Sequence, residues 1–397
     1  NNGLFTFLDL GDQPPSDAFL RREDLEKPEA RYPLTLHFCE QCGLVQLQDI
    51  VDPEILFREY VYTTGTNNSL RANFKELVEK LVVRFRLTTN DFAVDIGSND
   101  GTLLEQYAPH GVRVLGIDPS SAAAIARQKG IPTLVDFFNE RTAADVAKKY
   151  GKAKVITATN VFAHVSDLDS FMRGIDKLLS PEGIFVSESG YLLDMIETGG
   201  YDAIYHEHLR YYSVKPLMIL FEKFGMEIFD VERIPSHNGS MRVYAGLCGA
   251  HKKSTSVRAL LAREEKSGLY ERKTFTDFAR RVVAHRNGLK ETIREIRSFG
   301  KRIVGIGAPA KGNTLLNFCG FTSEDIEYLA EKSSLKIGLF TPGSHIPVVS
   351  EERMLAEQPE YALLLSWNLA EELIPKLRAK GYRGKFIIPF PEQKIVR

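Results

Sequence analysis

The segment Tyr205-His206-Glu207-His208 gathers side chains that can move protons near neutral pH. Two imidazoles beside a carboxylate and a phenol supply general acid and general base groups. A zinc-binding helix would read His-Glu-x-x-His, whereas these histidines are only two residues apart. At that spacing two rings face different sides of a helix and the same side of an extended strand. The segment favours proton transfer over metal binding, with a hydrogen-bonded polar cluster that supports a loop as the alternative.

A glycine-containing loop follows the short apolar run 92–96 and reads Gly97-Ser98-Asn99-Asp100-Gly101. A dinucleotide fold needs G-x-G-x-x-G, whose second glycine lets the backbone approach a pyrophosphate. Here Asn99 and Asp100 occupy that position, and a carboxylate repels phosphate. The loop therefore favours a cofactor with a cationic end and no phosphate, such as S-adenosylmethionine (SAM), over NAD. A strand–helix turn without a ligand is the alternative.

Acidic and aromatic residues after the next apolar runs complete this predicted cofactor site. Asp118 lies 21 residues after Gly97, near the spacing of about 20 at which an acidic residue meets a ribose in such folds. Asp136 and Phe137 could frame an adenine by a polar edge and an aromatic face. The predicted cofactor contacts are Asp95, Gly97, Asn99, Gly101, Asp118, Asp136, Phe137 and Asn160.

A second glycine loop, Gly305-Ile306-Gly307-Ala308-Pro309-Ala310-Lys311, ends another apolar run and opens a helical pattern. Small residues let the backbone approach an anion, a helix N-terminus directs N–H groups at it, and Lys311 adds a full charge. The Walker spacing and its Lys-Ser/Thr pair are absent. The loop predicts a pyrophosphate cradle, with an unliganded turn as the alternative.

Two further polar turns offer candidate substrate contacts. His237-Asn238-Gly239-Ser240-Met241-Arg242 combines a small turn with a cation, which suits a substrate anion or hydroxyl groups. Thr341-Pro342-Gly343-Ser344-His345 is a second turn that could line the same pocket. An ordinary hairpin turn and a plain loop are the respective alternatives.

The Cys39-Glu40-Gln41-Cys42-Gly43 knuckle is half of a Cys₄ zinc ribbon. The other two cysteines fall in other predicted domains, so the remaining ligands would lie upstream of Asn1. A redox Cys pair is the competing interpretation, but no thioredoxin-like strand precedes it. We expect a structural zinc half-site at Cys39 and Cys42 within a loop-rich module of residues 1–69.

These residues must be positioned by an α/β framework. Helical periodicity at 70–84 is followed by buried runs that alternate with helical patterns, which indicates a parallel sheet in a Rossmann-like domain of residues 70–253. Residues 254–300 lack proline, are rich in charge, and predict a connector of one or two long helices. Further apolar runs predict a smaller α/β domain over residues 301–397. The expected fold class is α/β in three parts.

Length and composition narrow the function further. A chain of 397 residues exceeds one core and suggests two to three domains. Its 51 basic and 52 acidic residues leave a net charge of −1, which disfavours nucleic acid as a partner. No run approaches the roughly 20 apolar residues of a membrane span, and four cysteines are too few for a disulfide framework. We expect a cytoplasmic protein that acts on a small molecule without membrane contact; the sequence does not indicate its oligomeric state.

Taken in order, the motifs resemble those of the SAM-dependent C-methyltransferases that act on nucleotide-linked 4-keto deoxysugars in branched-sugar biosynthesis, including that of antibiotics. The resemblance covers nearly the whole chain and rests on 8–14 (LDLGDQP), 39–46 (CEQCGLVQ), 95–101, 205–208 (YHEH), 237–240 (HNGS), 307–313 (GAPAKGN) and 341–343 (TPG). It implies a zinc-binding N-terminal domain, a SAM-binding middle domain, and a C-terminal domain that helps hold the sugar nucleotide. The chain departs from the family by lacking its first Cys pair.

The resemblance also implies roles for individual residues. His208 would remove the proton next to the ketone, Glu207 and Tyr205 would orient His208 or the sugar, and His206 or the phenol of Tyr62 would face the enolate oxygen. The substrate would be a dTDP sugar methylated at C3, with C5 left open. The implied substrate contacts are Tyr62, His164, His237, Asn238, Ser240, Arg242, Lys311 and Asn313.

Three other functions fit parts of the sequence. A SAM enzyme that methylates oxygen or nitrogen of a nucleotide sugar would use the same cofactor loop. An NAD-linked nucleotide-sugar oxidoreductase would need a better glycine fingerprint. A non-catalytic zinc-ribbon module would explain neither the two glycine loops nor the histidine cluster.

Overall fold

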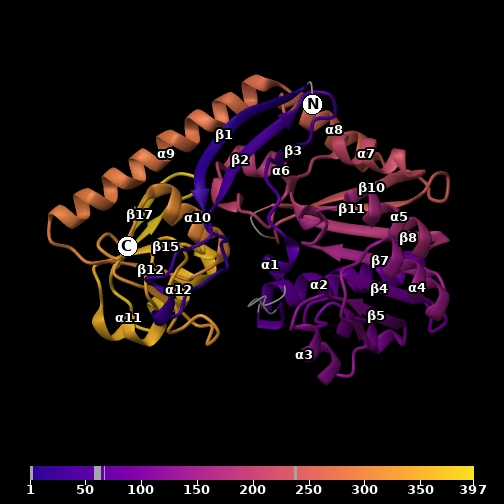
Figure 1. Cartoon of the computed structure of the whole chain (residues 1–397), viewed down its shortest axis with the longest axis horizontal. Helices are drawn as coiled ribbons and strands as arrows, with labels where there is room; N and C mark the ends of the chain where they lie inside the picture. The colour runs from indigo at the N-terminus through magenta and orange to yellow at the C-terminus, as the bar shows by residue number, and fades with distance from the viewer. Residues whose placement is uncertain (1–2, 58–63, 67, 237–238) are drawn as a thin grey trace.

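The computed structural model describes the chain except residues 1–2, 58–63, 67 and 237–238. Its strands form three sheets, and the α/β architecture in three parts is confirmed. In Figure 1 the C-terminal part lies on the left and the middle part on the right, with β1 and β2 arching between them. No helix in the described part of the chain has the length and apolar character of a membrane span.

The N-terminal part is a four-stranded antiparallel sheet in the order β1-β2-β3-β9. Its fourth strand comes from far along the chain: Val45 and Gln46 pair with Tyr211 and Arg210, directly after the YHEH segment. The sheet is followed by the short helix α1 (Pro53–Phe57). The strand bounds are β1 Leu4–Gln13, β2 Tyr32–Cys39, β3 Val45–Leu47 and β9 Arg210–Tyr211.

The middle part is a seven-stranded sheet in the order β10-β11-β8-β7-β4-β5-β6. β4 to β8 run parallel, and β11 lies antiparallel between β8 and β10. The strand order reverses between β4 and β7, where doubly wound sheets bind ligands at their carboxyl ends. The bounds are β4 Phe92–Ile96, β5 Arg113–Ile117, β6 Thr133–Leu134, β7 Ala153–Thr159, β8 Leu179–Gly190, β10 Met226–Ile234 and β11 Ser240–Leu247.

Helices cover both faces of this sheet, which is why β4 is buried at all five positions and reads as a continuous apolar run. One face packs on α2, with Phe74, Leu77 and Leu81 against Ala93 and Val155. The other face packs on α4 and α5. The helices are α2 Asn68–Phe85, α3 Ala123–Gln128, α4 Glu140–Tyr150, α5 Leu168–Leu178, α6 Leu192–Thr198 and α7 Val214–Lys223. After β4 the chain forms a 3₁₀ helix, η3 (Leu104–His110), which contains Pro109.

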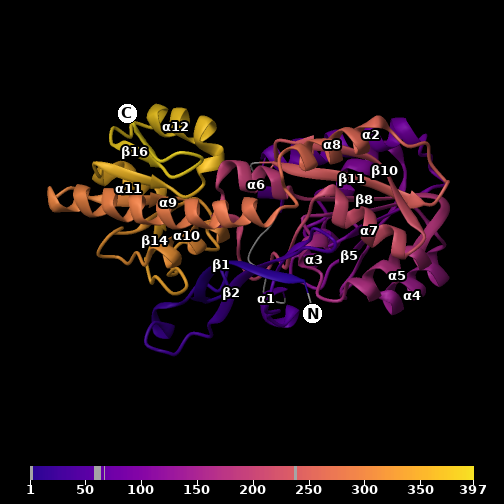
Figure 2. The ribbon, with the colours of Figure 1, turned by 90° about the horizontal axis from the view of Figure 1, so that it is seen from above.

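Two helices connect the middle and C-terminal parts: α8 (Thr255–Lys266) and α9 (Arg272–Ser298). α9 has 27 residues and so spans roughly 40 Å at 1.5 Å per residue. Its buried residues recur at helical spacing and form one apolar stripe under an otherwise charged surface: Phe275, Phe278, Val282, Leu289, Ile293 and Ile296. Figures 1 and 2 both show α9 running along the C-terminal part toward the middle part.

The C-terminal part is a six-stranded sheet in the order β14-β13-β12-β15-β16-β17, parallel except for β17. Its strand order also reverses, between β12 and β15, which gives the chain a second switch point. The strands are β12 Ile303–Ile306, β13 Leu329–Glu331, β14 Val348–Ser350, β15 Tyr361–Leu364, β16 Lys385–Ile388 and β17 Lys394–Val396. The helices are α10 Ala310–Cys319, α11 Glu351–Glu357 and α12 Ala370–Ala379.

Candidate active site

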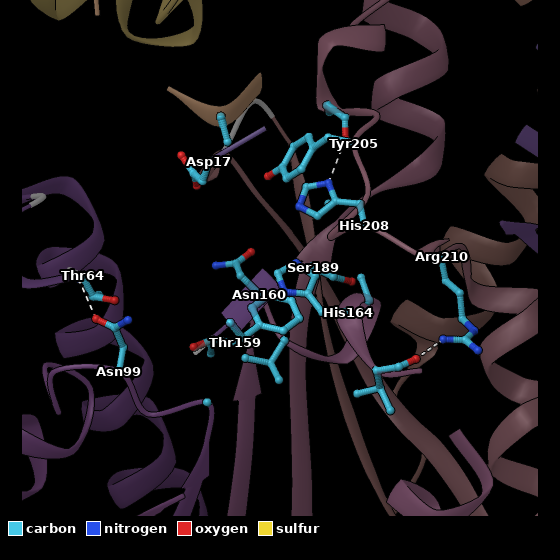
Figure 3. A pocket seen from close by; sticks show the side chains of 18 of the residues that line it. Asp17, Thr64, Asn99, Thr159, Asn160, His164, Ser189, Tyr205, His208 and Arg210 are labelled. Atoms are coloured by element: carbon cyan, nitrogen blue, oxygen red, sulfur yellow. Dashed lines mark hydrogen bonds between the residues drawn. The ribbon is translucent and has the colours of Figure 1, made fainter. Parts of the chain in front are cut away.

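One cavity of about 910 Å³ is lined by all three parts of the chain. The middle sheet contributes residues that follow β4, β5 and β7, and the C-terminal sheet contributes residues that follow β12 and β15. The N-terminal part adds Asp17, and the segment before β9 adds Tyr205 and His208. The two switch points therefore open into the same space, and Figure 3 shows part of this lining.

The loop after β4 needs glycine at its first position. Gly97 has φ +65°, and a Cβ there would lie 2.3 Å from Cγ2 of Val161. Asn99 also has a positive φ of 50°, a conformation that asparagine tolerates better than most residues. Gly101 lies outside the cavity lining, where a Cβ would be 2.5 Å from Cδ1 of Ile131, so this glycine allows close packing near α3.

Acidic side chains dominate the cavity wall at this switch point. The Asp118 carboxylate accepts hydrogen bonds from the backbone N–H of Asn99 (2.7 Å) and from the backbone and side chain of Ser120 (2.8 and 2.5 Å). Asp95 accepts from the Thr157 hydroxyl at 2.5 Å, and its burial raises its pKa to about 7. These contacts fix the orientation of two carboxyl groups at the cavity wall.

The other predicted cofactor residues lie near this wall in different ways. Phe137 and Asn160 line the cavity. Asn160 has φ +56°, and its N–H donates to the carbonyl of Glu188 at 2.7 Å. Asp136 is outside the lining, because its carboxylate accepts from the N–H of Phe137 (2.8 Å) and lies 3.7 Å from Arg141.

The residues at this wall fit SAM. Among the described residues, the lining that follows β4, β5 and β7 contains no lysine or arginine, while it contains Asp95 and Asp118. Such a surface attracts a sulfonium and an ammonium group and repels a pyrophosphate. Asp118, Asn99 and Gly97 all lie in this part of the lining.

Because the YHEH segment forms a turn, its two histidine side chains lie in different environments. The His208 N–H donates to the Tyr205 carbonyl at 2.9 Å, so the segment is not extended. His206 points away from the cavity lining, and its Nε2 donates to the Tyr32 carbonyl at 3.1 Å. His208 lines the cavity. Glu207 is 3% exposed and lies outside the lining.

The hydrogen bond of His208 defines the tautomer of its neutral ring. Nδ1 lies 2.8 Å from the Ala203 carbonyl oxygen, and because a carbonyl only accepts, Nδ1 carries a proton, which leaves the lone pair of the neutral imidazole on Nε2. Tyr205 packs on the His208 ring with centroids 4.0 Å apart, and His164 stacks on it at 5.1 Å. Figure 3 shows this cluster, with the Tyr205 hydroxyl directed toward Asp17.

The neighbours of His208 are held in neutral forms. Burial, reinforced by the nearby His208, lowers the pKa of His164 well below its usual value. Burial raises the pKa of Tyr205 well above its usual value, and the negative charges of Glu207 and Asp17 add to this shift. At neutral pH a neutral imidazole and a phenol, both able to donate hydrogen bonds, therefore surround the His208 ring.

The second switch point presents cations to the cavity. The Lys311 ammonium donates to the Asn368 side chain at 2.6 Å and lies 3.8 Å from the Asp202 carboxylate. Burial lowers the pKa of Lys311. Gly307, with φ +80°, places the backbone so that a Cβ would lie 2.5 Å from Oγ of Ser366.

Three predicted substrate residues lie outside the cavity lining. Arg242 is fully buried and pairs with Glu188 at 3.0 Å, where it joins two strands of the middle sheet. Ser240 donates to the Ser236 carbonyl at 3.0 Å. Asn313 is 1% exposed and donates to the Ser16 carbonyl at 2.6 Å. The predictions for Tyr62, His237 and Asn238 concern positions outside the described residues.

Several cavity residues carry no motif in the sequence. Asp17 follows a Pro-Pro-Ser stretch, and Lys336 holds its carboxylate at 3.0 Å while also donating to the Ala308 carbonyl at 2.9 Å. Trp367 lies under the Lys311 ammonium, 4.4 Å from the ring centroid. Arg210 donates to the carbonyls of Val165 and Ser166. Trp367 is the one tryptophan of the chain, which is the only signal that singled out any of them.

The Cys39–Cys42 pair does not complete a metal site within the described residues. No group of three potential His, Cys, Asp or Glu ligands gathers anywhere in that part of the chain. Two thiols supply half of the four ligands of a structural zinc ion. The pair lies at the end of β2, beside the start of β1, where Leu4 pairs with Cys39.

Comparison with known families covers most of the chain. A domain described as "Putative zinc binding domain" matches residues 1–57, a "Methyltransferase domain" matches 70–231, and a "C-methyltransferase C-terminal domain" matches 235–391.

Individual proteins resemble the chain to different extents. C-methyltransferase NovU of Streptomyces niveus is 34% identical over 392 residues, which are 98% of this chain and 93% of the relative. Ubiquinone biosynthesis O-methyltransferase of Rhodopseudomonas palustris (strain BisA53) is 31% identical over 96 residues, 23% of this chain and 37% of the relative.

Solved structures resemble part of the chain. A SAM-dependent methyltransferase from Anabaena variabilis is 15% identical, with a TM-score of 0.37 over 45% of this chain and 85% of its own. Magnesium protoporphyrin IX methyltransferase (ChlM) from Synechocystis PCC 6803 is 16% identical, with a TM-score of 0.35 over 46% and 88%. From the domain matches and the full-length relative, the chain belongs to the SAM-dependent C-methyltransferase family.

Proposed function

We propose that this C-methyltransferase acts on a nucleotide-linked 4-keto deoxysugar, carried on dTDP, and methylates the carbon next to the ketone at C3. The observation that carries the proposal is the orientation of His208 in a cavity that joins an acidic switch point to a basic one. A carbon next to a ketone is acidic enough for an imidazole to remove its proton, provided that this base is held close to that carbon.

His208 is the proposed base. Its Nδ1–H is engaged with the Ala203 carbonyl, so the proton from the substrate carbon would go to Nε2. The Nδ1 hydrogen bond also favours the imidazolium that this step produces, since the charged ring donates a stronger hydrogen bond to the carbonyl than the neutral ring does. A histidine needs no extreme pKa shift for such a step near neutral pH.

Neutral donors next to His208 would stabilise the enolate. Tyr205 and His164 both line the cavity, and at neutral pH the phenol keeps its O–H and the neutral imidazole keeps one N–H. Hydrogen bonds aimed at charge that develops in the transition state supply much of the acceleration in such reactions. His206 is less suited to this role, since its Nε2 is engaged with Tyr32 outside the cavity lining.

The two switch points would hold the two reactants. Asp118, Asn99 and Gly97 would hold SAM, which would supply the methyl group taken up by the enolate carbon, leaving S-adenosylhomocysteine. Lys311 and Lys336 line the opposite end of the cavity and would hold the diphosphate of the sugar nucleotide. Both lysines are partly neutralised by carboxylates, Asp202 and Asp17, which limits their attraction for other anions.

The test is a pair of variants assayed in D₂O with SAM and dTDP-4-keto-6-deoxyglucose. His208→Asn should reduce both α-proton exchange and methyl transfer by roughly 10²- to 10⁴-fold, the usual loss for a general base. His110→Asn, at the end of η3 and outside the cavity lining, should retain both. NMR of the product places the methyl on carbon or on oxygen. Wild-type exchange and transfer rates in His208→Asn would contradict the assignment.

A further inference from the structure

The turn formed by η5 (Tyr201–Ala203) and Ile204 belongs to the middle part of the sequence, but side chains from α9, α10 and the C-terminal sheet hold it. The turn provides the carbonyl that orients His208, that of Ala203. The orientation of the proposed base therefore depends on residues about 80 to 165 positions away in the sequence.

Three contacts fix the turn at Tyr201, Asp202 and Ile204, and the last two of these join buried residues. The Trp367 indole N–H donates to the Asp202 carboxylate at 2.6 Å. The Thr314 hydroxyl, on α10, donates to the Ile204 carbonyl at 2.9 Å. All four of these residues are buried, so each bond is shielded from competition by water.

The contact at Tyr201 has a defined direction. Nε2 of His285, on α9, lies 2.7 Å from the Pro389 carbonyl and must donate to it. Nδ1 of His285 is therefore the acceptor, and the Tyr201 hydroxyl donates to it at 3.2 Å. The Tyr201 ring also packs edge-on against Phe318 and Phe390. With Tyr201, Asp202 and Ile204 all anchored, the Ala203 carbonyl between them has little freedom.

We propose that Asp202, Thr314 and Trp367 are positioning residues, which hold the Ala203 carbonyl so that it takes the Nδ1 proton of His208 and leaves the lone pair on Nε2. None of the three contacts His208 through a hydrogen bond of its own; they act through the turn. The inference rests on the proposed function of His208 as the base.

The proposal explains an otherwise costly arrangement. Asp202 is a carboxylate with 2% of its side chain exposed, and burial raises its pKa. A buried carboxylate is retained in a fold only where its partners compensate the lost hydration. Here the partners are the indole N–H and the Lys311 ammonium, both of which also line or approach the catalytic cavity.

The experiment measures the tautomer of His208 directly, in the full-length protein with ¹⁵N-labelled histidine rings. The His208 signals are assigned by their absence in His208→Asn. In the wild type Nδ1 should be protonated and Nε2 unprotonated. Thr314→Val and Trp367→Phe, which each remove one donor while keeping similar bulk, should populate the opposite tautomer. Both should lower kcat about five- to tenfold, the usual effect of one lost hydrogen bond, with KM values within about twofold.

Matched variants separate positioning from general destabilisation. Thr292→Val removes a hydroxyl from α9 that bonds Gln393 at 2.6 Å, away from the turn, and should alter neither tautomer nor kcat. Asp202→Asn keeps an oxygen that can accept the indole N–H and should retain the wild-type tautomer, whereas Asp202→Leu should not. If Thr314→Val or Trp367→Phe does not fold, the contrast between the two Asp202 variants supplies the same test.

The outcomes distinguish this inference from the proposed function. A wild-type His208 protonated on Nε2, or an unchanged tautomer in every folded variant that loses a turn contact, would overturn the positioning role even if His208→Asn is inactive. An active His208→Asn would overturn the proposed base, while the tautomer measurements would still report on the turn.

Discussion

The two switch points of this chain share a topology and differ in charge. Each lies where the strand order of a mostly parallel sheet reverses, and each has a glycine with a positive φ directly after its central strand, Gly97 after β4 and Gly307 after β12. The first is lined by Asp95 and Asp118, whereas Lys311 lies at the second. The sheet topology therefore determines where a ligand lies, and the side chains determine which ligand can bind.

Under the proposed function, this difference in charge would also determine how the two reactants are arranged. A cationic methyl donor and an anionic sugar nucleotide would each avoid the other's site, so the two reactants would enter the cavity in one arrangement. His208 lines the same cavity, and under the proposed function it would act on a substrate carbon held between the two sites. The following variants test whether the two sites are independent and selective.

The largest effect is expected from Asp118→Asn. Losing the charge of a carboxylate that also accepts from Asn99 and Ser120 should weaken SAM binding roughly 10- to 100-fold, since hydrogen bonds to charged groups contribute about 1.5–3 kcal/mol. Calorimetric titration should show dTDP binding unchanged within about twofold. Asp145→Asn, on the exposed side of α4, is the matched control. Equal losses for both ligands would show that the sites are not independent.

A matched glycine pair comes next. Gly97→Ala and Gly307→Ala each combine a positive φ with a close neighbour, Val161 at 2.3 Å and Ser366 at 2.5 Å. Each should lower the free energy of unfolding by about 2 kcal/mol, the range for a residue forced into the left-handed region. Denaturant unfolding and calorimetry should show that the first variant loses SAM affinity and the second loses dTDP affinity.

The control for this pair is Gly130→Ala, where φ is +81° but the added Cβ meets no atom within 4 Å. It should lose stability from the backbone conformation alone and should bind both ligands normally. If it weakens SAM binding as much as Gly97→Ala does, the close contact with Val161 is not the cause.

Lys311→Met should have a smaller effect than the variants above, and it should weaken dTDP binding rather than SAM binding. Removing the ammonium should weaken dTDP binding about tenfold, near the value of one charge-assisted contact, and should leave SAM binding unchanged. The remaining affinity should depend less on salt concentration than in the wild type. A loss of SAM affinity instead would contradict the proposal that Lys311 holds the diphosphate.

The smallest effect concerns pH. The pKa of Asp95 is raised to about 7 by burial, and a nearby cation favours its ionised form. SAM binding should therefore strengthen a few-fold between pH 6 and pH 8, as calorimetry can measure, and Asp95→Asn should remove that dependence. In the ligand-free protein, the free energy of unfolding should depend on pH in the opposite direction. The raised pKa of Asp95 contributes stability below about pH 4, and this contribution is lost as the pH rises to about 7.

The sequence alone determined the local parts of this protein. The apolar runs that end in Gly97 and Gly307, and the absence of a pyrophosphate-type glycine after β4, depend on a few adjacent residues. Backbone conformation and close approach act over that same short range, so these features were predictable. The motifs that indicate the family are also short runs of adjacent residues, so the sequence alone was enough to identify them.

The tertiary structure alone decided which polar side chains reach the cavity. His206 and His208 are two residues apart, yet one bonds Tyr32 and the other faces the cavity, because a turn precedes the pairing of β9 with β3. Arg242 joined a buried ion pair, and Asp17 reached the cavity through contacts with Lys336 and, at Ser16, with Asn313. These partners lie far apart in the chain, and no local pattern records such a contact, because it forms only when the three parts of the chain pack together.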